Sequence, residues 1–270
     1  YDDKFYFGIT LGIQSLHYKS FSVYTEEIVG ETNNKLEKFS IYQDFTSSGI
    51  GINFKAGFIY RPIPVLRLGF AIHTPTYYDL DAYANNNVSA KFTELPVEDA
   101  KPTDNFEYGE SAWTDYSYKL KTPWRFMASA ATVLGQRAII SFDYEYVDYT
   151  TAKYSNDGAK NEYLETNNAI KAIYKSTHNF RAGAEYRFNS VFCLRGGYAY
   201  SASPYTKGEM NEKNDIQTIT GGLGLNFGVF YADLAYLHKN SKLNGLFYYY
   251  ETSKGEVIES PEFQTKFKDN

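Results

Sequence analysis

The sequence is poor in cysteine, methionine and histidine, and it has no excess of basic residues. Its 270 residues include one Cys, two Met and four His, and the formal net charge is −5. The lone cysteine, Cys193, excludes an internal disulfide and a zinc site built from several cysteines. The four histidines show no metal-ligand spacing, so we expect no metal site. The acidic balance argues against a nucleic-acid partner, which requires a basic surface.

Long hydrophobic runs are also missing. No segment approaches the roughly 20 apolar residues of a transmembrane helix. The mean hydropathy of −0.47 is that of a soluble protein. A membrane β-barrel escapes this rule, because only every second residue of its strands faces lipid. Aromatic residues, in contrast, are abundant, with 27 Tyr and 20 Phe, and both types favour strands.

A two-residue periodicity dominates the sequence and is clearest over RFMASAATVLGQRAIISFDYEY, residues 125–146. One face of both arms is almost entirely apolar, whereas the other carries Arg125, Ser129, Asp143 and Glu145. Such alternation is typical of a strand whose two faces meet different solvents. The same pattern recurs in residues 5–14, 50–61, 66–73, 180–188, 194–200, 219–227 and 230–236. The sequence therefore predicts an all-β, antiparallel protein.

The connections alternate in length. Short turns are expected near 62–65, 135–136, 189–191 and 228, and long polar loops at about 28–48, 86–115, 154–177, 203–215 and 239–258. This places all short turns at one end of the sheet, as in outer-membrane barrels, whose periplasmic turns are short and extracellular loops long. Within the loops, helical spacing of apolar residues predicts a short helix in 161–175, and the acidic, proline-containing segment 94–110 is expected to be irregular.

The position of the charged residues decides which face meets lipid. Ten of them share the face opposite the apolar one: Lys55, Arg67, Arg125, Asp143, Glu145, Arg181, Glu185, Arg187, Arg195 and Asp233. Each Lys or Arg exposed to lipid at the midplane costs roughly 2–4 kcal/mol, so the set would cost on the order of 20–30 kcal/mol. We therefore expect the charges to line a lumen and the apolar face to contact the lipid bilayer. A soluble barrel with its apolar face inward is the competing interpretation.

Three segments carry a family resemblance: residues 48–78 (with YRP…LRLG…H-P), 118–152 (with TPWR) and 178–188. They resemble the FadL-type outer-membrane transport proteins, which include the TodX-like channels, and in particular the Bacteroidetes members of that family. The resemblance implies a non-enzymatic, fourteen-stranded barrel of the bacterial outer membrane, plugged by an N-terminal hatch. It also implies uptake of hydrophobic molecules such as long-chain fatty acids or aromatic hydrocarbons, usually through a lateral opening in the wall.

We expect residues 1–270 to form a single outer-membrane β-barrel domain, with about nine to ten strands recognisable. Compared with the family pattern, the hatch, the early strands and the last strand are not found in these residues. We expect a monomer whose partners are the lipid bilayer and a hydrophobic small molecule, and which needs no cofactor.

Candidate ligand-pathway residues are the cationic or titratable side chains expected at mid-height in the lumen: Lys55, His73, Arg125 and Arg181. A cationic side chain there could receive a fatty-acid carboxylate through a charge-assisted hydrogen bond. The simpler interpretation is structural ion pairing. Across the short turns Arg125 should lie near Glu145, and Glu185 near Arg195.

Alternative functions stay open at this stage. Asp143 and Glu145 lie about 7 Å apart along a strand, a spacing compatible with a hydrolytic carboxylate pair, although such pairs are common in polar lumens. A surface adhesin or structural barrel, or an outer-membrane lipase with a Ser–His pair, would be built on the same frame. The aromatic residues Tyr77–Tyr78 and Phe247–Tyr250 are expected to form either a capture groove at the cell surface or extensions of strands.

Overall fold

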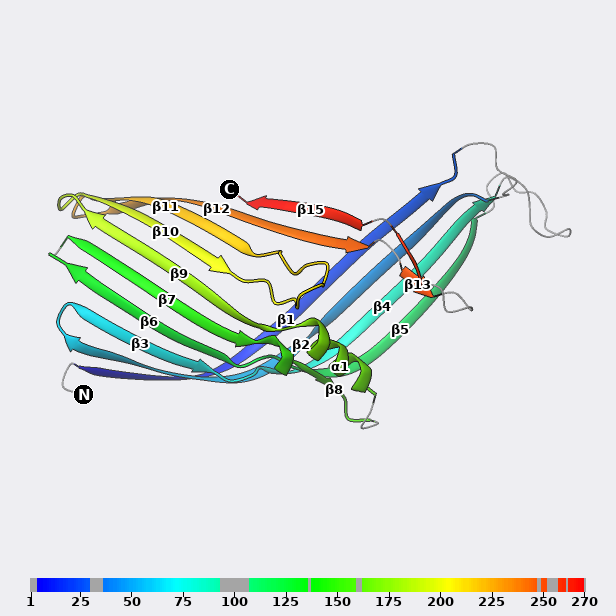
Figure 1. Ribbon diagram of the computed structural model, residues 1–270, viewed down its shortest axis with the longest axis horizontal. Coiled ribbons are helices and arrows are strands. Elements are labelled where there is room, and N and C mark those ends of the chain that lie inside the picture. The colour runs from blue at the N-terminus through cyan, green and yellow to red at the C-terminus, as the bar shows by residue number, and fades with distance from the viewer. Residues whose placement is uncertain are drawn as a thin grey trace, which may run out of the picture.

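The protein is an all-β antiparallel structure with one short α-helix (Figure 1). The computed structural model describes residues 4–29, 36–92, 107–135, 137–158, 162–246, 249–251, 257–260 and 262–269. The elements are β1 (Phe5–Glu27), β2 (Leu36–Ile63), β3 (Leu66–His73), β4 (Tyr77–Phe92), β5 (Glu107–Lys121), β6 (Arg125–Leu134), β7 (Ala138–Asp148), the 3-10 helix η1 (Tyr149–Thr151), β8 (Lys153–Ser155), α1 (Leu164–Ile173), β9 (Ser176–Arg187), β10 (Phe192–Ser201), β11 (Ile216–Asn226), β12 (Tyr231–Leu246), β13 (Tyr249–Glu251), β14 (Val257–Glu259) and β15 (Glu262–Asp269).

One 13-stranded sheet contains every strand except the small hairpin of β13 and β14. Its strands follow the order β15-β12-β11-β10-β9-β7-β6-β3-β2, and β1 pairs with β2. The continuation β4-β5-β8 extends from the outer half of β2. Within the described residues, β1 and β15 each pair with a single strand and so form the two long edges of the sheet.

The short connections gather at one end of the sheet, on the left in Figure 1. They join β2 to β3, β6 to β7, β9 to β10 and β11 to β12. Gly135 and Gly228 occupy two of these turns with φ of 55° and 81°, a conformation that favours glycine. The sequence prediction that the short turns share one end is confirmed.

The apolar face of the sheet is its exposed outer face. Ile9, Leu11 and Leu234 are exposed to 74%, 69% and 70%, far more than core residues of a soluble protein. Fully buried hydrophobic side chains are few among the described residues, and they are Leu80, Ala82, Tyr118, Val147 and Ile170. The interpretation as a soluble barrel with an apolar core is therefore wrong, and the strands need a membrane around them.

The strands are of two lengths. Strands β6, β7, β9, β10 and β11 have 10 to 12 residues, which is about what a tilted strand needs to cross a bilayer. Strands β1 and β2 have 23 and 28 residues, so their outer halves project beyond the membrane together with β4 and β5 (Figure 1).

This projecting sheet corrects two sequence-based expectations. The stretches 28–48 and 86–115 were expected to be long polar loops, yet residues 36–48 belong to β2, 86–92 to β4 and 107–115 to β5. The segment 94–110 was expected to be irregular, but its residues 107–110 begin β5, and the rest lies outside the described residues. Residues 239–246 likewise belong to β12. Above the membrane the outer face of a strand meets water instead of lipid, so the continuous apolar row that reveals a membrane strand is lost.

A crease separates the membrane part of the sheet from the projecting part. It consists of residues 74–76 between β3 and β4, residues 122–124 between β5 and β6, and η1 with Ala152 between β7 and β8. Pro75 and Pro123 lack the N–H needed for a regular ladder. The two Thr-Pro segments bind each other instead: the Thr76 N–H donates to Thr122 Oγ1 (2.8 Å), and the Thr122 N–H donates to the Thr76 carbonyl (3.1 Å).

The helix expected within 161–175 is present as α1 (Leu164–Ile173) and lies beside the crease (Figure 1). It buries Ile170 and is held to β8 by Asn167, which donates to the Tyr154 carbonyl and accepts from the Tyr154 N–H. No helix among the described residues is long and apolar enough to cross a membrane.

Gly49 lets β4 lie close against β2 just beyond the crease, and its replacement tests this architecture. A Cβ at Gly49 would lie 2.0 Å from the backbone oxygen of Asp79 on β4, a contact that no side-chain rotation can relieve. We expect Gly49→Ala to lower the free energy of unfolding by about 1–3 kcal/mol. Gly221→Ala is the control, because its Cβ would meet nothing within 4 Å. Urea unfolding in detergent, followed by Trp fluorescence, measures both, and equal midpoints would contradict this account of the crease.

Candidate functional site

The inner face of the sheet, opposite the apolar outer face, holds a cavity of about 600 Å³. Strands β1, β2, β3, β6, β7 and β9 contribute to this inner cavity. Its charged and strongly polar lining residues are Lys55, His73, Asp143, Glu145, Asn179 and Arg181. A space of this size holds a small organic ligand.

The cavity exists because the strands next to it carry small residues on their inner face. Gly8 lies opposite Gly57, and Gly57 lies opposite Ala71, so three neighbouring strands meet with almost no side-chain volume. A Cβ at Gly8 would have nothing within 4 Å. Met127 continues this row on β6 opposite Ala71 and adds an apolar wall. Between the charged groups the inner surface therefore has little side-chain volume and little polarity, and this leaves the space of the cavity.

Lys55, His73 and Arg125 form one row across the inner face. The register pairs Lys55 with His73 and His73 with Arg125 on consecutive strands β2, β3 and β6. Arg125 Nη1 lies 3.8 Å from Glu145 Oε2, so its charge is partly balanced. Among the described residues no carboxylate lies within ion-pair distance of Lys55.

Arg181 on β9 faces Asp143 on β7 as a direct cross-strand neighbour. No ion pair within 4.0 Å joins the two in the part of the chain that the structure describes, so both charged groups remain available to the cavity. Glu145, two residues further along β7, accepts a hydrogen bond of 3.0 Å from Asn179 and has Arg125 beside it. The cavity therefore combines two cations without ion-pair partners among the described residues, the carboxylate of Glu145, which is already satisfied, and the carboxylate of Asp143, which faces Arg181.

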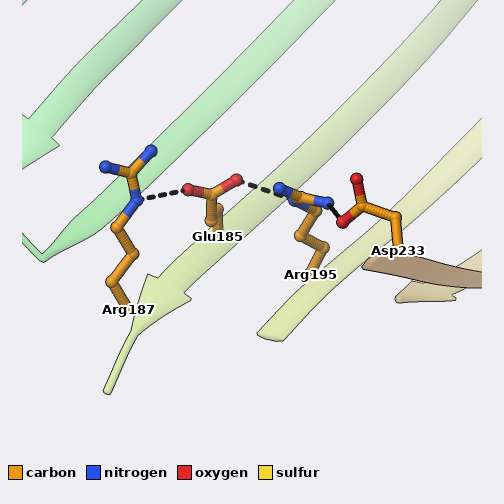
Figure 2. Close-up of polar contacts among 4 residues, drawn as sticks. All are labelled: Glu185, Arg187, Arg195 and Asp233. Carbon is orange, nitrogen blue, oxygen red and sulfur yellow. Dashed lines mark hydrogen bonds and ion pairs between the residues drawn. The ribbon is translucent and has the colours of Figure 1, made fainter. Parts of the chain in front are cut away.

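A second charged cluster lies nearer the short-turn end, away from the inner cavity. Figure 2 shows Glu185 between two arginines: Arg187 Nε donates to Oε1 (2.9 Å), and Arg195 Nε donates to Oε2 (2.8 Å). Arg195 also donates through Nη1 to Asp233 Oδ1 at 2.6 Å. All four charges are balanced within a network spanning β9, β10 and β12, so this cluster crosslinks the wall rather than offering a free charge.

Above the cavity, at the level of the crease, two hydrogen bonds connect side chains on the inner face. Asn53 Nδ2 donates to Thr76 Oγ1 (2.8 Å), and the Tyr78 hydroxyl donates to Gln14 Oε1 (2.7 Å). Asn53 is buried, and its Oδ1 has no hydrogen-bond partner. We call these four side chains the polar neck.

Beyond the neck, the same face carries a tyrosine-rich patch. Its centre is Leu80, Ala82 and Tyr118, which are buried. Around this centre pack Leu16, Phe45, Tyr78, Leu120, Tyr154 and Tyr163. The rings of Tyr116, Tyr118, Tyr154 and Tyr163 follow one another at 5.6–6.0 Å between centroids. Tyr77 and Tyr78 were expected either to form a capture groove or to extend a strand, and both residues begin β4. Phe247 and Tyr248 lie outside the described residues.

A family model described as outer membrane protein transport protein (OMPP1/FadL/TodX) matches residues 2–225. The chain belongs to this family. It is a transport family of the bacterial outer membrane, so the protein is a non-enzymatic β-barrel protein that transports hydrophobic compounds. The predicted fold class, localisation and lack of enzymatic activity agree with this assignment.

A solved structure of a FadL homologue agrees on the fold, and a second structure is similar to a lesser degree. A FadL homologue from Pseudomonas aeruginosa superposes with a TM-score of 0.51 at 13% identity, covering 98% of this chain and 73% of the homologue. The toluene transporter TodX of Pseudomonas putida gives a TM-score of 0.44 at 11% identity, covering 98% of this chain and 78% of TodX. No curated protein sequence matches the chain.

The structure brings together most, but not all, of the residues predicted for the ligand pathway of this FadL/TodX-family protein. Lys55, His73 and Arg181 line the inner cavity, whereas Arg125 lies beside it and contacts Glu145. Asp143 and Glu145 also line the cavity, and Glu185 and Arg195 belong to the separate cluster of Figure 2. Their roles remain predictions.

Sequence reasoning did not single out several lining residues: Tyr6, Thr10, Met127, Ser129 and Asn179. Their position on the inner face of correctly registered strands is the signal that could have found them. No group of three or more His, Cys, Asp or Glu side chains in the described part of the chain could hold a metal ion.

The charge network of Figure 2 leads to a stability prediction. Glu185→Gln leaves Arg187 without a carboxylate partner among the described residues and leaves Arg195 with Asp233 alone, so we expect the free energy of unfolding to fall by about 1 kcal/mol, limited by solvent screening of the arginines. Asp143→Asn, which removes a carboxylate without an ion pair among the described residues, should cost less. Chemical unfolding in detergent at low and high salt measures both. A larger effect for Asp143→Asn, or no salt dependence, would contradict the assignment.

Proposed function

We propose that this protein is a passive outer-membrane channel for hydrophobic small molecules that carry a carboxylate, with long-chain fatty acids as the substrate class. The observation that supports this best is the inner cavity, where Lys55 and Arg181 have no ion-pair partner among the described residues and lie beside an uncharged surface of Gly8, Gly57 and Ala71. Such a cavity suits a molecule with one negative end and a long apolar body.

The proposed binding mode uses both kinds of surface. A carboxylate in the cavity would accept charge-assisted hydrogen bonds from Lys55 or Arg181, each contributing about 1.5–3 kcal/mol when water is excluded. The acyl chain would lie against Met127 and the glycine-rich strands. His73, between Lys55 and Arg125 in the register, would add a further donor when protonated. The chain needs no cofactor for this, because the molecule moves down its own concentration gradient.

The tyrosine-rich patch supplies the proposed route of entry. It shares the inner face of β1 and β2 with the cavity and lies farther from the membrane, with the polar neck between them. The exposed ring of Tyr116 at the edge of the buried cluster would contact apolar molecules from water first. The same patch favours a second candidate substrate class, aromatic hydrocarbons, which would not require Lys55 or Arg181.

The alternative of a surface adhesin or purely structural barrel is less well supported. A lumen closed by paired charges would favour it, but the described charge network around Glu185 leaves the inner cavity open. The proposal treats all 270 residues as one outer-membrane domain.

Ligand binding to the protein in detergent tests the proposal. We expect saturable binding of oleate and of its neutral analogue oleyl alcohol. The double variant Lys55→Gln/Arg181→Gln should weaken oleate binding about tenfold or more and leave oleyl alcohol unaffected, because only oleate loses charged hydrogen bonds. Arg125→Gln is the matched control, since that arginine contacts Glu145, and it should bind oleate nearly as wild type does.

Each other outcome is informative. Equal oleate affinity in the double variant would contradict the role of the inner cavity as the carboxylate site. Binding of toluene without binding of oleate would move the assignment to aromatic hydrocarbons. If a correctly folded protein bound none of the three probes, transport of these hydrophobic compounds would be contradicted.

A further inference from the structure

Two lysines on the outer surface face each other across neighbouring strands just beyond the crease. Lys121 at the end of β5 is the direct register partner of Lys153 in β8. Tyr154, the next residue, packs on the inner tyrosine-rich patch, so Lys153 points to the opposite, outer side. Like charges directly opposite one another destabilise a sheet. A pair of this kind is therefore unfavourable unless an anion lies between the two ammonium groups.

The neighbouring lysine on β5, Lys119, does have an acidic partner. Lys119 lies 2.5 Å from Asp157, and that hydrogen bond raises the pKa of Lys119 above its ordinary value. In contrast, no carboxylate lies within 4.0 Å of Lys121 or Lys153 among the described residues. Their two charges are uncompensated in a chain whose net charge is −5.

Another cross-strand lysine pair shows how the chain balances such charges elsewhere. Lys38 and Lys91 are register partners on β2 and β4, at the far end of the projecting sheet. Lys38 lies 3.3 Å from Glu27, and Lys91 lies 3.0 Å from Glu37. The protein supplies its own anions at that pair and supplies none, among the described residues, at Lys121 and Lys153. The pair Lys242 and Lys266 on β12 and β15 also has no such partner, so the absence of a carboxylate alone does not mark a site, and the surroundings of Lys121 and Lys153 decide.

The unpaired lysines border a cavity of about 510 Å³ that opens on the outer surface, here called the lysine cavity. Its lining includes Tyr77, Lys119, Lys121 and Lys153, and also one acidic residue, Asp79, the register partner of Lys119, so the three lysines outnumber the acidic residue. Tyr77 is 60% exposed, and its ring centroid lies 6.0 Å from Lys121 Nζ, a cation–π arrangement that holds the ammonium beside an apolar surface. The cavity therefore presents a positive rim and an aromatic wall to the same ligand.

Its height places the lysine cavity at the membrane surface. Trp124, exposed on the outer face and stacked on Phe126, belongs to the aromatic belt that marks a bilayer interface. Lys121 ends β5 on the far side of the crease from β6, three residues before Trp124, and so lies just beyond this belt on the side away from the membrane. Tyr77 pairs with Ile52 on β2, and Ile52 pairs with Ile13 on β1; both isoleucines are exposed and belong to the apolar outer face. An occupant can therefore contact lysines with its polar end and these apolar side chains with its hydrocarbon part.

We propose that the lysine cavity binds the phosphate of an outer-leaflet glycolipid of the lipid A type, held between Lys121 and Lys153 with its acyl chains against Tyr77, Ile52 and Ile13. A phosphate dianion balances two lysines at once, and lysine is a good point-charge ligand for phosphate. A neutral or zwitterionic lipid would leave both ammonium groups unbalanced. The binding would hold the crease at a defined height in the outer leaflet.

The test measures retention of lipid A by the full chain in phosphatidylcholine nanodiscs that contain bis-phosphorylated lipid A, read by native mass spectrometry of the released complex. We expect wild type to retain lipid A, and Lys121→Gln/Lys153→Gln to bind it about thirtyfold more weakly, the combined effect of two lysines at an anionic membrane surface. The matched control is Lys242→Gln/Lys266→Gln. It removes two charges from another direct cross-strand pair, on β12 and β15, that lines none of the cavities described above.

Three results would overturn the proposal. Equal lipid A retention by Lys121→Gln/Lys153→Gln and wild type would show that the pair is not the phosphate ligand. An equal loss of lipid A retention in the Lys242→Gln/Lys266→Gln control would show that the effect comes from net charge and not from a specific site. If inorganic phosphate displaced lipid A and raised the thermal midpoint of wild type alone, the site would be one for free phosphate. Unchanged oleate binding in the Lys121→Gln/Lys153→Gln variant separates this outcome from any failure of the transport proposal.

Discussion

Placing a charged side chain in the hydrocarbon layer of a membrane costs about 2–4 kcal/mol at the midplane, and this cost constrains every strand of the protein. Because side chains of a strand alternate between two faces, a single register decides which face carries the charges. The outer face accordingly exposes Ile9, Leu11 and Leu234, while Lys55, Asp143 and Arg181 gather on the inner face. The inner cavity is thus a consequence of the outer surface: polar groups excluded from lipid must share the interior.

The crease marks the height at which this constraint ends. Below it the sheet has lipid on its outer side, and above it the outer face of β1, β2, β4 and β5 meets water while their inner face carries the tyrosine-rich patch. The Thr76–Thr122 hydrogen bonds join the two kinked connections, so the sheet changes direction without losing its pairing. Three functional surfaces are arranged around this level, namely the inner cavity below it, the tyrosine-rich patch above it, and the lysine cavity on the outer side.

The membrane part of the fold could be predicted from the sequence because apolar and polar residues alternate along its strands, with lipid on one face and a polar lumen on the other. Strands β6 and β7, with their glycine turn, follow from residues 125–146 alone, and so does the proximity of Arg125 and Glu145. The projecting strands β4 and β5 were missed because their outer face meets water and carries polar residues such as Asp79 and Asp81, so the apolar row of a lipid-facing strand is absent. The inner cavity depends on which glycines meet across strands, as Gly8 and Gly57 do, and that requires the register between strands distant in sequence.

The most direct test of the two-faced sheet is its contact with lipid, residue by residue. In a Cys193→Ser background, single cysteines at Ser141, Phe142, Ile219 and Thr220 would carry a fluorophore, in bilayers containing brominated lipids. The account predicts strong quenching at Phe142 and Ile219, which lie on the exposed apolar face, and weak quenching at their neighbours Ser141 and Thr220. Equal quenching at adjacent positions, or the opposite alternation, would contradict it.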